Sequence, residues 1–391
     1  MATSSQSLAR HIKRYLHAPT HEWFASCAPG FETVLQNELL SLGAVEPQLT
    51  MGGVSFQGKL ELGYQANLWL RTANRVLLRI ARFKAKRPEE LFRQAHSLPW
   101  ELLLSTHASL RIESSSTASW LSHSGLIAET LQDAIRRRLA ETLPSEALLD
   151  DGTTEQLILV RLEEDEVVLS LDSSGEHLHR RGYRLASAKA PLRETLAAEM
   201  LMTAGYRGHM PLLDPMCGAG TFSIEAALLA ANLPPGLQRD FTFMHWPSFK
   251  EATWQHLCKK AREGAARPEQ PIVARDLHAG ALNAIASNAE RAGVSEFVQI
   301  EKADFFKAPP LESPGLVVLN PPYGERIGEK DTLARFYRKM GDRLHEAYQG
   351  WKFAILVPQP WLVSELHLSY DQRIRLPHGG LKVELLTGFI P

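Results

Sequence analysis

The sequence predicts an α/β protein whose C-terminal half forms an open, mostly parallel sheet, preceded by smaller α+β segments. From about residue 190 onward, short apolar strands alternate with helical patterns, which is the rhythm of a parallel sheet with crossover helices. Before that point the elements form compact α+β patterns that are too short for a nucleotide-binding domain. The length of 391 residues corresponds to two to three domains.

The composition excludes several classes of protein. Lys and Arg number 43 against 44 Asp and Glu, so the chain is not a uniformly basic nucleic-acid coat, although one domain could still carry a basic face. The three cysteines, Cys27, Cys217 and Cys258, are too widely spaced for a disulfide framework or a cysteine-rich zinc site. No apolar run approaches the ~18 residues of a membrane helix, and the N-terminus has no signal-peptide pattern. We expect a cytoplasmic protein without a membrane partner.

The N-terminal part is expected to alternate strands and helices after a tail of 21 residues. An apolar stretch from Trp23 to Ala28 predicts a strand, and Pro29-Gly30 is a turn signal. Apolar residues then recur at helical spacing until Gly43, a residue type that commonly ends helices. The next expected elements are a strand over Val54–Phe56, a helix over Glu61–Val76 and a strand over Leu77–Phe83.

A second α+β block is expected between residues 65 and 172, followed by a linker over residues 173–190. Leu110–Trp120 alternates as a strand does, and Gly125–Ala140 has an amphipathic helical pattern. Gln156–Asp172 predicts two strands joined through an acidic turn.

Two clusters of basic residues are candidates for contact with RNA. The first is near the end of the predicted helix, where the same cations could simply complement the helix dipole. The second interleaves basic residues with Tyr183 at a predicted domain junction, a mixture that suits a phosphate backbone. Together they favour a nucleic-acid surface composed of Arg136, Arg137, Arg138, Arg180, Arg181 and Arg184.

The predicted domain over residues 191–391 carries the strand–helix alternation. Its end differs, because Pro377-His378-Gly379-Gly380 predicts a hairpin turn between two strands. The expected elements are strands at Pro211–Leu213, Ile272–Ala274, Phe297–Ile300, Gly315–Leu319, Trp351–Val357, Gln372–Leu376 and Lys382–Phe389, with helices at Phe222–Asn232, Ala279–Gly293 and Leu333–Tyr348.

A glycine loop follows the first strand of this domain and directly precedes a helix. It reads Asp214-Pro215-Met216-Cys217-Gly218-Ala219-Gly220-Thr221. No lysine follows the second glycine and a third glycine is missing, so it is neither a P-loop nor a dinucleotide fingerprint. Such a loop at the first crossover of an open sheet still lets a ligand approach the backbone closely.

Two acids stand where the next strands would end. Asp276 follows Ile272–Arg275, and a carboxylate there can accept hydrogen bonds from both hydroxyls of a ribose. Asp304 follows Val298–Ala303 and could receive an adenine amino group. Either acid alone could be an N-cap or turn residue. Polar side chains at three consecutive strand ends together predict a cofactor of the adenosine type.

The sequence Asn320-Pro321-Pro322-Tyr323 follows the apolar strand Leu316–Leu319. An amide oxygen and a backbone carbonyl are acceptors that can hold the two N–H bonds of an exocyclic amine, which frees its lone pair for attack. The prolines fix the backbone so that the second acceptor is already in place, and Tyr323 offers a face for stacking a base. The four residues indicate methyl transfer to a planar amide or amine nitrogen.

With these residues in view, the chain from Trp23 to its end resembles the bacterial THUMP-domain methyltransferases that modify guanine N2 in large-subunit ribosomal RNA. The resemblance is most specific over residues 179–184, 190–198, 214–221 and 320–326. It implies a ferredoxin-like segment over residues 22–64, an RNA-binding THUMP domain over residues 65–172 and a Rossmann-like methyltransferase domain with S-adenosylmethionine as methyl donor. This chain departs from the family pattern at Ala219, often Ser, and at Arg275, often Gly.

The resemblance also implies roles for individual residues. Thr195 would lie near the methionine part of the cofactor, which the loop from Asp214 to Thr221 would hold. Asp276 would bind the ribose and Asp304 the adenine. The target base would be gripped by Asn320, Pro321, Pro322 and Tyr323, with Asn320 also close to the cofactor. The implied cofactor-binding set is Thr195, Asp214, Pro215, Cys217, Gly218, Gly220, Thr221, Asp276, Asp304 and Asn320.

Three alternatives stay open. A transfer-RNA guanine-N2 branch has the same architecture, and a protein methyltransferase acting on glutamine amides would share the motif at Asn320. From a different class, the chain could be a catalytically silent RNA-binding or ribosome-assembly factor. No metal is expected, because His177 and His179 lack a third ligand nearby.

Overall fold

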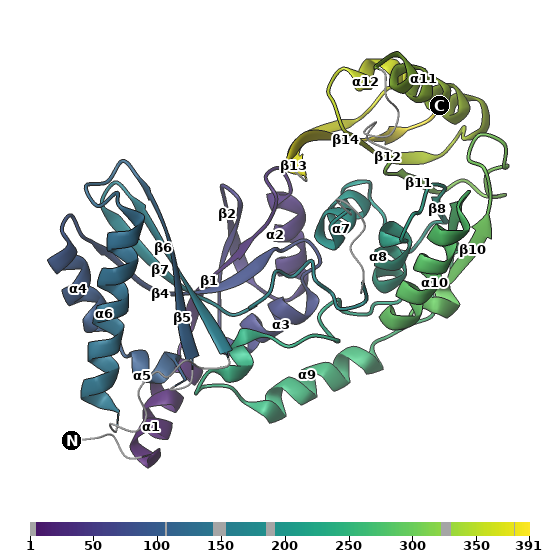
Figure 1. Cartoon of the computed structure of the whole chain (residues 1–391). Helices are drawn as coiled ribbons and strands as arrows, with labels where there is room; N and C mark the ends of the chain where they lie inside the picture. The colour runs from purple at the N-terminus through teal and green to yellow at the C-terminus, as the bar shows by residue number, and fades with distance from the viewer. Residues whose placement is uncertain (1–4, 106–107, 144–153, 185–191, 322–329, 379) are drawn as a thin grey trace. The chain divides into compact units, whose positions relative to one another are not determined.

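The computed structural model describes residues 5–105, 108–143, 154–184, 192–321, 330–378 and 380–391 (Figure 1). The described chain divides into two compact units. Unit 1 comprises residues 1–27, 35–178 and 239–258, and unit 2 comprises residues 28–34, 179–238 and 259–391. A short N-terminal segment therefore belongs to the C-terminal unit, and an excursion from the C-terminal half belongs to unit 1. The sequence predicted neither exchange.

Unit 1 is built on one seven-stranded sheet in the order β2-β3-β1-β4-β7-β6-β5 (Figure 1). Neighbouring strands are antiparallel except β5 and β6, which are parallel. The sheet runs without a break across residue 64, where a domain boundary was expected. The strands are β1 His21–Ser26, β2 Val45–Thr50, β3 Gly53–Gly58, β4 Arg75–Lys84, β5 Ala108–Thr117, β6 Thr154–Glu163 and β7 Glu166–Asp172.

One face of this sheet is apolar and packs against helices. Trp23, Leu78 and Leu171 occupy paired positions on that face and are fully or almost fully buried. Gly63 lies so close to Trp23 that an added Cβ would sit 2.2 Å from its ring, so this contact requires glycine. The helices of unit 1 include α3 Leu60–Trp69, α4 Pro88–His96, α5 Trp100–Leu103 and α6 Ser124–Thr142.

The helix expected over residues 61–76 is shorter than predicted and ends at Trp69. Leu70 has an extended backbone, and the buried carboxylate of Glu38 accepts hydrogen bonds from the backbone amides of Arg71 and Thr72 at 2.8 and 3.1 Å. These amides bond to a side chain distant in sequence instead of to helix carbonyls, so the chain leaves the helix and begins β4 at Arg75.

Several elements were not predicted from the sequence. They are α1 Ser5–Ile12, the adjoining π-helix Lys13–His17, β2, α4, α5, α7 Glu194–Thr203 and α9 Glu251–Glu263. The helix expected from Phe31 is confirmed as α2 Glu32–Ser41.

Unit 2 contains the predicted parallel sheet, in the order β10-β9-β8-β11-β12-β14-β13 (Figure 1). All neighbours are parallel except β14, which is antiparallel to β12 and β13. The strand order reverses between β8 and β11, and ligands of open sheets bind at such a point, beyond the carboxyl ends of the strands. The strands are β8 Leu212–Asp214, β9 Ile272–Asp276, β10 Val298–Lys302, β11 Leu316–Leu319, β12 Lys352–Val357, β13 Gln372–His378 and β14 Leu381–Phe389.

The central strands of this sheet, β8, β9, β11 and β12, are buried on both faces. Leu212 belongs to one hydrophobic cluster and the next residue, Leu213, to another, as expected for a strand covered on both sides. The first cluster includes residues of α7, α8 Thr221–Ala230 and α10 Ala279–Ala292, and the second includes residues of α11 Lys330–Ala347 and α12 Leu362–Glu365. The predicted α/β class is confirmed. Among the helices described, none is long and apolar enough to cross a bilayer.

Candidate active site

The glycine loop connects the end of β8 to the start of α8. Gly218 and Gly220 have left-handed backbones, with φ of +51° and +81°, which disfavours other residues. The two glycines differ in their surroundings. A Cβ on Gly220 would lie 2.2 Å from Ile285 on α10, whereas a Cβ on Gly218 would meet nothing within 4 Å. Gly220 is thus required for packing, and Gly218 leaves an open approach to the backbone.

Asp214 is the last residue of β8 and is 1% exposed. Its Oδ2 accepts a hydrogen bond of 2.9 Å from the Ser223 hydroxyl, which sequence reasoning did not single out. Its buried Oδ1 has no hydrogen-bond partner among the described residues. Burial raises the pKa of Asp214 to about 7, and the nearby carboxylate of Asp276 adds to this shift. A buried acceptor of this kind suits a cationic or N–H-bearing ligand.

Asp276 ends β9 and bonds to the glycine loop. Its two carboxylate oxygens accept hydrogen bonds from the backbone amides of Gly218 at 3.0 Å and His278 at 2.9 Å. Each oxygen keeps a further lone pair for a ligand hydroxyl. The side chain of the neighbouring Arg275 bonds instead to Glu301, at 2.8 Å, and to the Pro309 carbonyl, at 2.6 Å. These bonds occupy the Arg275 side chain elsewhere, so it need not crowd the position beside Asp276.

Asp304 follows β10 and is half-buried. Its Oδ1 accepts a 2.9 Å hydrogen bond from the backbone amide of Phe306, and Lys307 lies 3.8 Å from its Oδ2. The Ala303 amide donates to the Asp276 carbonyl at 3.2 Å, which places the segment before Asp304 beside the end of β9. The three predicted acids therefore lie at the same edge of the sheet.

Asn320 directly follows β11, the strand paired with β8. Its buried Oδ1, like Oδ1 of Asp214, has no hydrogen-bond partner among the described residues. Pro321 is buried next to it. The predicted partners Pro322 and Tyr323 lie outside the described residues. The structure thus brings Asn320 to the strand adjoining Asp214, at the position where the strand order reverses.

Comparison with known proteins identifies the family. Residues 181–384 match the family model of the RMKL-like methyltransferase domain. The chain belongs to this family. Residues 22–77 match the RlmL ferredoxin-like domain.

Individual relatives match nearly all of the chain. The ribosomal RNA large subunit methyltransferase K/L of Syntrophotalea carbinolica is 36% identical over 379 residues, which are 94% of this chain and 53% of that protein. The chain thus spans about half the length of the K/L relatives it matches. A putative RNA methyltransferase of Synechocystis is 34% identical, over 94% of this chain and 97% of that protein.

Solved structures agree with the fold. A putative methyltransferase named SMU.472, complexed with SAH, is 30% identical with a TM-score of 0.85, covering 95% of this chain and 98% of that one. A Listeria monocytogenes protein described as a predicted N6-adenine-specific DNA methylase is 29% identical with a TM-score of 0.86, covering 95% and 97%.

Arg184 of the RMKL-like domain was predicted to contact RNA, but its side chain contacts the first turns of α7 and α8. It donates hydrogen bonds to the Thr221 hydroxyl, in the first turn of α8, and to the Leu192 carbonyl at 3.1 Å. It also lies 3.5 Å from the Glu194 carboxylate. Thr195, the next residue, is buried in the first turn of α7. Arg184 therefore links the first turns of α7 and α8.

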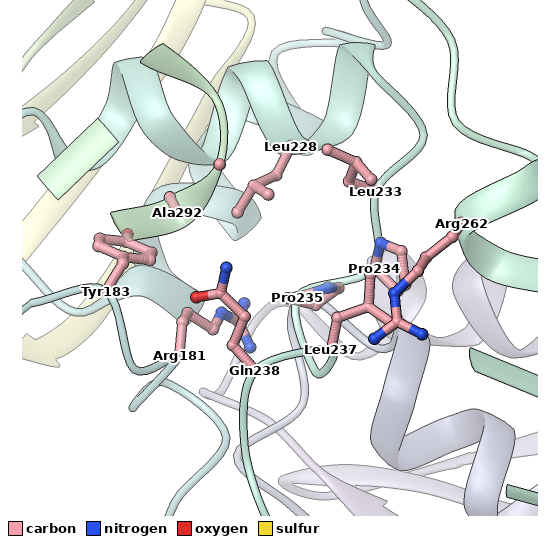
Figure 2. Close-up of a pocket in the computed structure, with 11 residues that line it drawn as sticks. Arg181, Tyr183, Leu228, Leu233, Pro234, Pro235, Leu237, Gln238, Arg262 and Ala292 are labelled. Atoms are coloured by element: carbon pink, nitrogen blue, oxygen red, sulfur yellow. The ribbon is translucent and has the colours of Figure 1, made fainter. Parts of the chain in front are cut away.

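Arg181 is also removed from the predicted RNA surface. It is 3% exposed and its guanidinium lies 3.4 Å from the buried Glu225, to which the Tyr183 hydroxyl donates at 3.2 Å. Arg181 and Tyr183 line a pocket of about 250 Å³ in unit 2 (Figure 2). A buried guanidinium requires a charged or polar partner. Here the partner, Glu225, lies 44 residues further along the chain, so local sequence patterns do not predict the pairing.

The cluster in α6 keeps two exposed members. Arg138 is partly buried and bonds to Glu101 at 2.7 Å, which gives it a structural partner. Arg137 is exposed, lies 3.1 Å from Asp133 and stacks over Phe92. Arg136 is exposed, and so is Arg180 in the predicted linker. In the part of the chain that the structure describes, no cluster of His, Cys, Asp or Glu could hold a metal.

Proposed function

We propose that the protein is an S-adenosylmethionine-dependent methyltransferase acting on the exocyclic N2 of a guanine in RNA of the large ribosomal subunit. The observation that carries this proposal is a pair of buried oxygens, Oδ1 of Asp214 and Oδ1 of Asn320, at the ends of adjacent strands, neither of which has a hydrogen-bond partner among the residues that the structure describes. One is suited to the cofactor and the other to an amine. The names of the relatives as ribosomal RNA methyltransferases support the choice of RNA.

The residues present fit S-adenosylmethionine. Asp214 offers the ammonium of the methionine part an acceptor to which no described residue donates, and the open space at Gly218 admits a ligand against the loop backbone. Pro215, Cys217, Gly220 and Thr221 complete that loop, with Thr195 on the adjoining helix. Asp276 would hold the ribose hydroxyls and Asp304 the adenine amino group. The cofactor, when bound, supplies a methyl group activated by attachment to a sulfonium.

Asn320 and the backbone carbonyl of Pro321 would accept the two N–H bonds of the guanine amine. Holding both hydrogens directs the nitrogen lone pair away from the ring and toward the methyl group, so orientation supplies most of the rate. The methylated nitrogen gives up one proton after transfer, and this proton passes to solvent, because the Asn320 amide oxygen accepts a hydrogen bond but is too weak a base to take the proton. Pro322 would stiffen this turn and Tyr323 would stack on the base.

RNA recognition would rest on unit 1. We assign residues 65–172 to a THUMP domain and its exposed Arg136 and Arg137 to phosphate contacts, to which the exposed Arg180 of unit 2 would add. A ribosomal substrate implies that the protein works in the cytoplasm.

A labelled-methyl assay tests this function. The protein is offered ribosomal RNA, transfer RNA, DNA and a glutamine-bearing release-factor protein side by side, and the labelled product is digested and identified by mass spectrometry. N2-methylguanine in large-subunit ribosomal RNA is the expected product. If N2-methylguanine formed in transfer RNA alone, the substrate would be transfer RNA and not ribosomal RNA. Label in adenine or in protein would refute the proposal. Absence of calorimetric binding of S-adenosylmethionine would favour the silent assembly factor.

A further inference from the structure

Arg79, on the sheet of unit 1, is a cation that forms no ion pair within 4 Å in the part of the chain that the structure describes. Its guanidinium donates a 2.8 Å hydrogen bond to the Ser170 hydroxyl and stacks over Phe24, 4.5 Å from the ring centroid. Its Nε is buried and has no hydrogen-bond partner among the described residues, and the carboxylate that attracts it, that of Glu22, pairs with Arg82 instead. Charged groups that are partly desolvated are normally paired. The missing partner therefore calls for an explanation.

The strand register gathers two more arginines on the same face. Arg82 on β4 and Arg161 on β6 both pair with Val168 of β7, one from each side, while Arg79 pairs with Ser170 two residues away. Residues two apart on a strand share a face. All three arginines line one cavity of about 230 Å³ within unit 1, together with Phe24, Thr50, Met51, Ser55, Glu163, Glu166 and Val168.

Like charges at this cavity disfavour one another. Burial is the main cause that lowers the pKa of Arg79 to about 10, and the charges of Arg82 and Arg161 lower it further, while Glu22 opposes the shift. If the three clustered guanidinium groups had no function, replacing the central one with an uncharged residue would stabilise the folded protein. Residues whose pKa is shifted by burial and by neighbouring charges are often found at functional sites.

Carboxylates form ion pairs with the two outer arginines, Arg82 and Arg161, but among the described residues none does so with the central Arg79. Arg82 lies 3.1 Å from Glu166 and 3.5 Å from Glu22, and Arg161 lies 2.9 Å from Glu163. These pairs are exposed, and exposed pairs contribute little, so they can rearrange around an incoming anion. Arg79 has no such partner to give up.

We propose that this cavity is a phosphate-binding site, with Arg79 as its central cation and Arg82 and Arg161 reaching the anion from either side. Guanidinium groups match phosphate oxygens in forked pairs, and Phe24 holds the Arg79 fork in place from one face. The phosphate could belong to an RNA backbone or to a free nucleotide. The site lies in unit 1 and requires no methyl donor, so it goes beyond the proposed methyl transfer.

Arg79→Met is the decisive variant, because methionine keeps most of the apolar stem while removing the charge. If Arg79 serves a ligand, the melting temperature of Arg79→Met stays equal to or rises above that of the wild type, since an unpaired desolvated cation has been removed. Arg111→Met is the matched control. Arg111 is an exposed arginine on β5 of the same sheet that pairs with Glu113 and Glu155.

Binding is then titrated with inorganic phosphate, guanosine monophosphate and a short single-stranded RNA oligonucleotide, all without methyl donor. For a backbone phosphate, Arg79→Met weakens RNA binding about 10-fold or more and reduces the log–log salt slope by about 0.7, whereas Arg111→Met does not. For a free nucleotide, only the two small probes lose affinity. Both results support the site.

The proposal is overturned if Arg79→Met binds all three probes as the wild type does. It is equally overturned if Arg79→Met melts well below Arg111→Met and its lost binding follows its unfolded fraction, because Arg79 is then structural. Neither result bears on methyl transfer, which the labelled-methyl assay measures separately.

Discussion

The backbone amide of Gly218 donates a 3.0 Å hydrogen bond to the carboxylate of Asp276, which ties the glycine loop after β8 to the end of β9. The same carboxylate also accepts from the His278 amide at the start of α10. Asp276 therefore shapes the loop as well as facing the proposed ribose. Replacing it should damage cofactor binding twice, once through the lost ligand contact and once through the loosened loop.

Asp276→Asn is expected to weaken S-adenosylmethionine binding by about 10- to 100-fold, the range for losing hydrogen bonds to a charged group. Isothermal titration calorimetry measures the change. Asp342→Asn, an exposed acid on α11, is the control and should bind as the wild type does. Equal affinity in all three proteins would remove Asp276 from the cofactor site.

Changing the two loop glycines to alanine should have different effects, on stability for Gly220 and on cofactor affinity for Gly218. In Gly220→Ala the new Cβ would collide with Ile285 at 2.2 Å, so we expect a large fall in melting temperature. In Gly218→Ala the Cβ enters open space, so the fold loses only about 1–2 kcal/mol from the left-handed backbone. Gly218→Ala should therefore stay folded and lose cofactor affinity, because its Cβ occupies the ligand's approach. Thermal melts and calorimetry on both variants test this, and a folded Gly218→Ala with unchanged affinity would contradict it.

Asp214 should make the stability of the cofactor-free protein depend on pH. Its pKa is about 7 in the folded protein against an ordinary 3.8, so the folded state binds the proton more tightly than the unfolded state. The free energy of unfolding therefore falls as pH rises from about 4 to about 7 and levels off above that range. Asp214→Asn resembles the protonated side chain and should lack this component.

Denaturant titrations of wild type and Asp214→Asn between pH 5 and 8 measure the difference. Asp172 of unit 1, whose pKa burial raises to about 6, gives a slope of the same sign in both proteins, so only the difference between them is assigned to Asp214. Stability curves that run parallel across this range would show that Asp214 does not titrate there.

Local patterns were enough to predict the sheet of unit 2 and its polar strand ends. Strands β8, β9 and β11 are buried and read as short apolar runs, so the polar residue at or just after the end of each one marks the sheet edge. The pairing of β8 with β11 brings Asp214 and Asn320 to that edge. The order of the strands required the structure, whereas the polar residues at the strand ends were visible in the sequence.

Partners distant in sequence account for what was missed. The helix expected over residues 61–76 ends at Trp69, because the Glu38 carboxylate accepts hydrogen bonds from the backbone amides that follow. Arg181 is buried because it forms an ion pair with Glu225 of α8. Sequence reading assigned arginines to the surface by default, which holds for Arg136 and Arg180 but not for Arg181. A buried ion pair leaves no local signature.

Asn320→Ala should separate binding from chemistry. The alanine cannot accept an amine N–H, so methyl transfer should fall by at least about 100-fold, comparable to the loss of one aligned hydrogen bond in other active sites. Calorimetric affinity for S-adenosylmethionine should stay close to that of the wild type, because Asp214, Gly218 and Asp276 are intact. Gln299→Ala, which removes an exposed amide from the edge strand β10, should keep full activity. Wild-type turnover in Asn320→Ala would mean that another group holds the amine and that the turn after β11 only closes the strand.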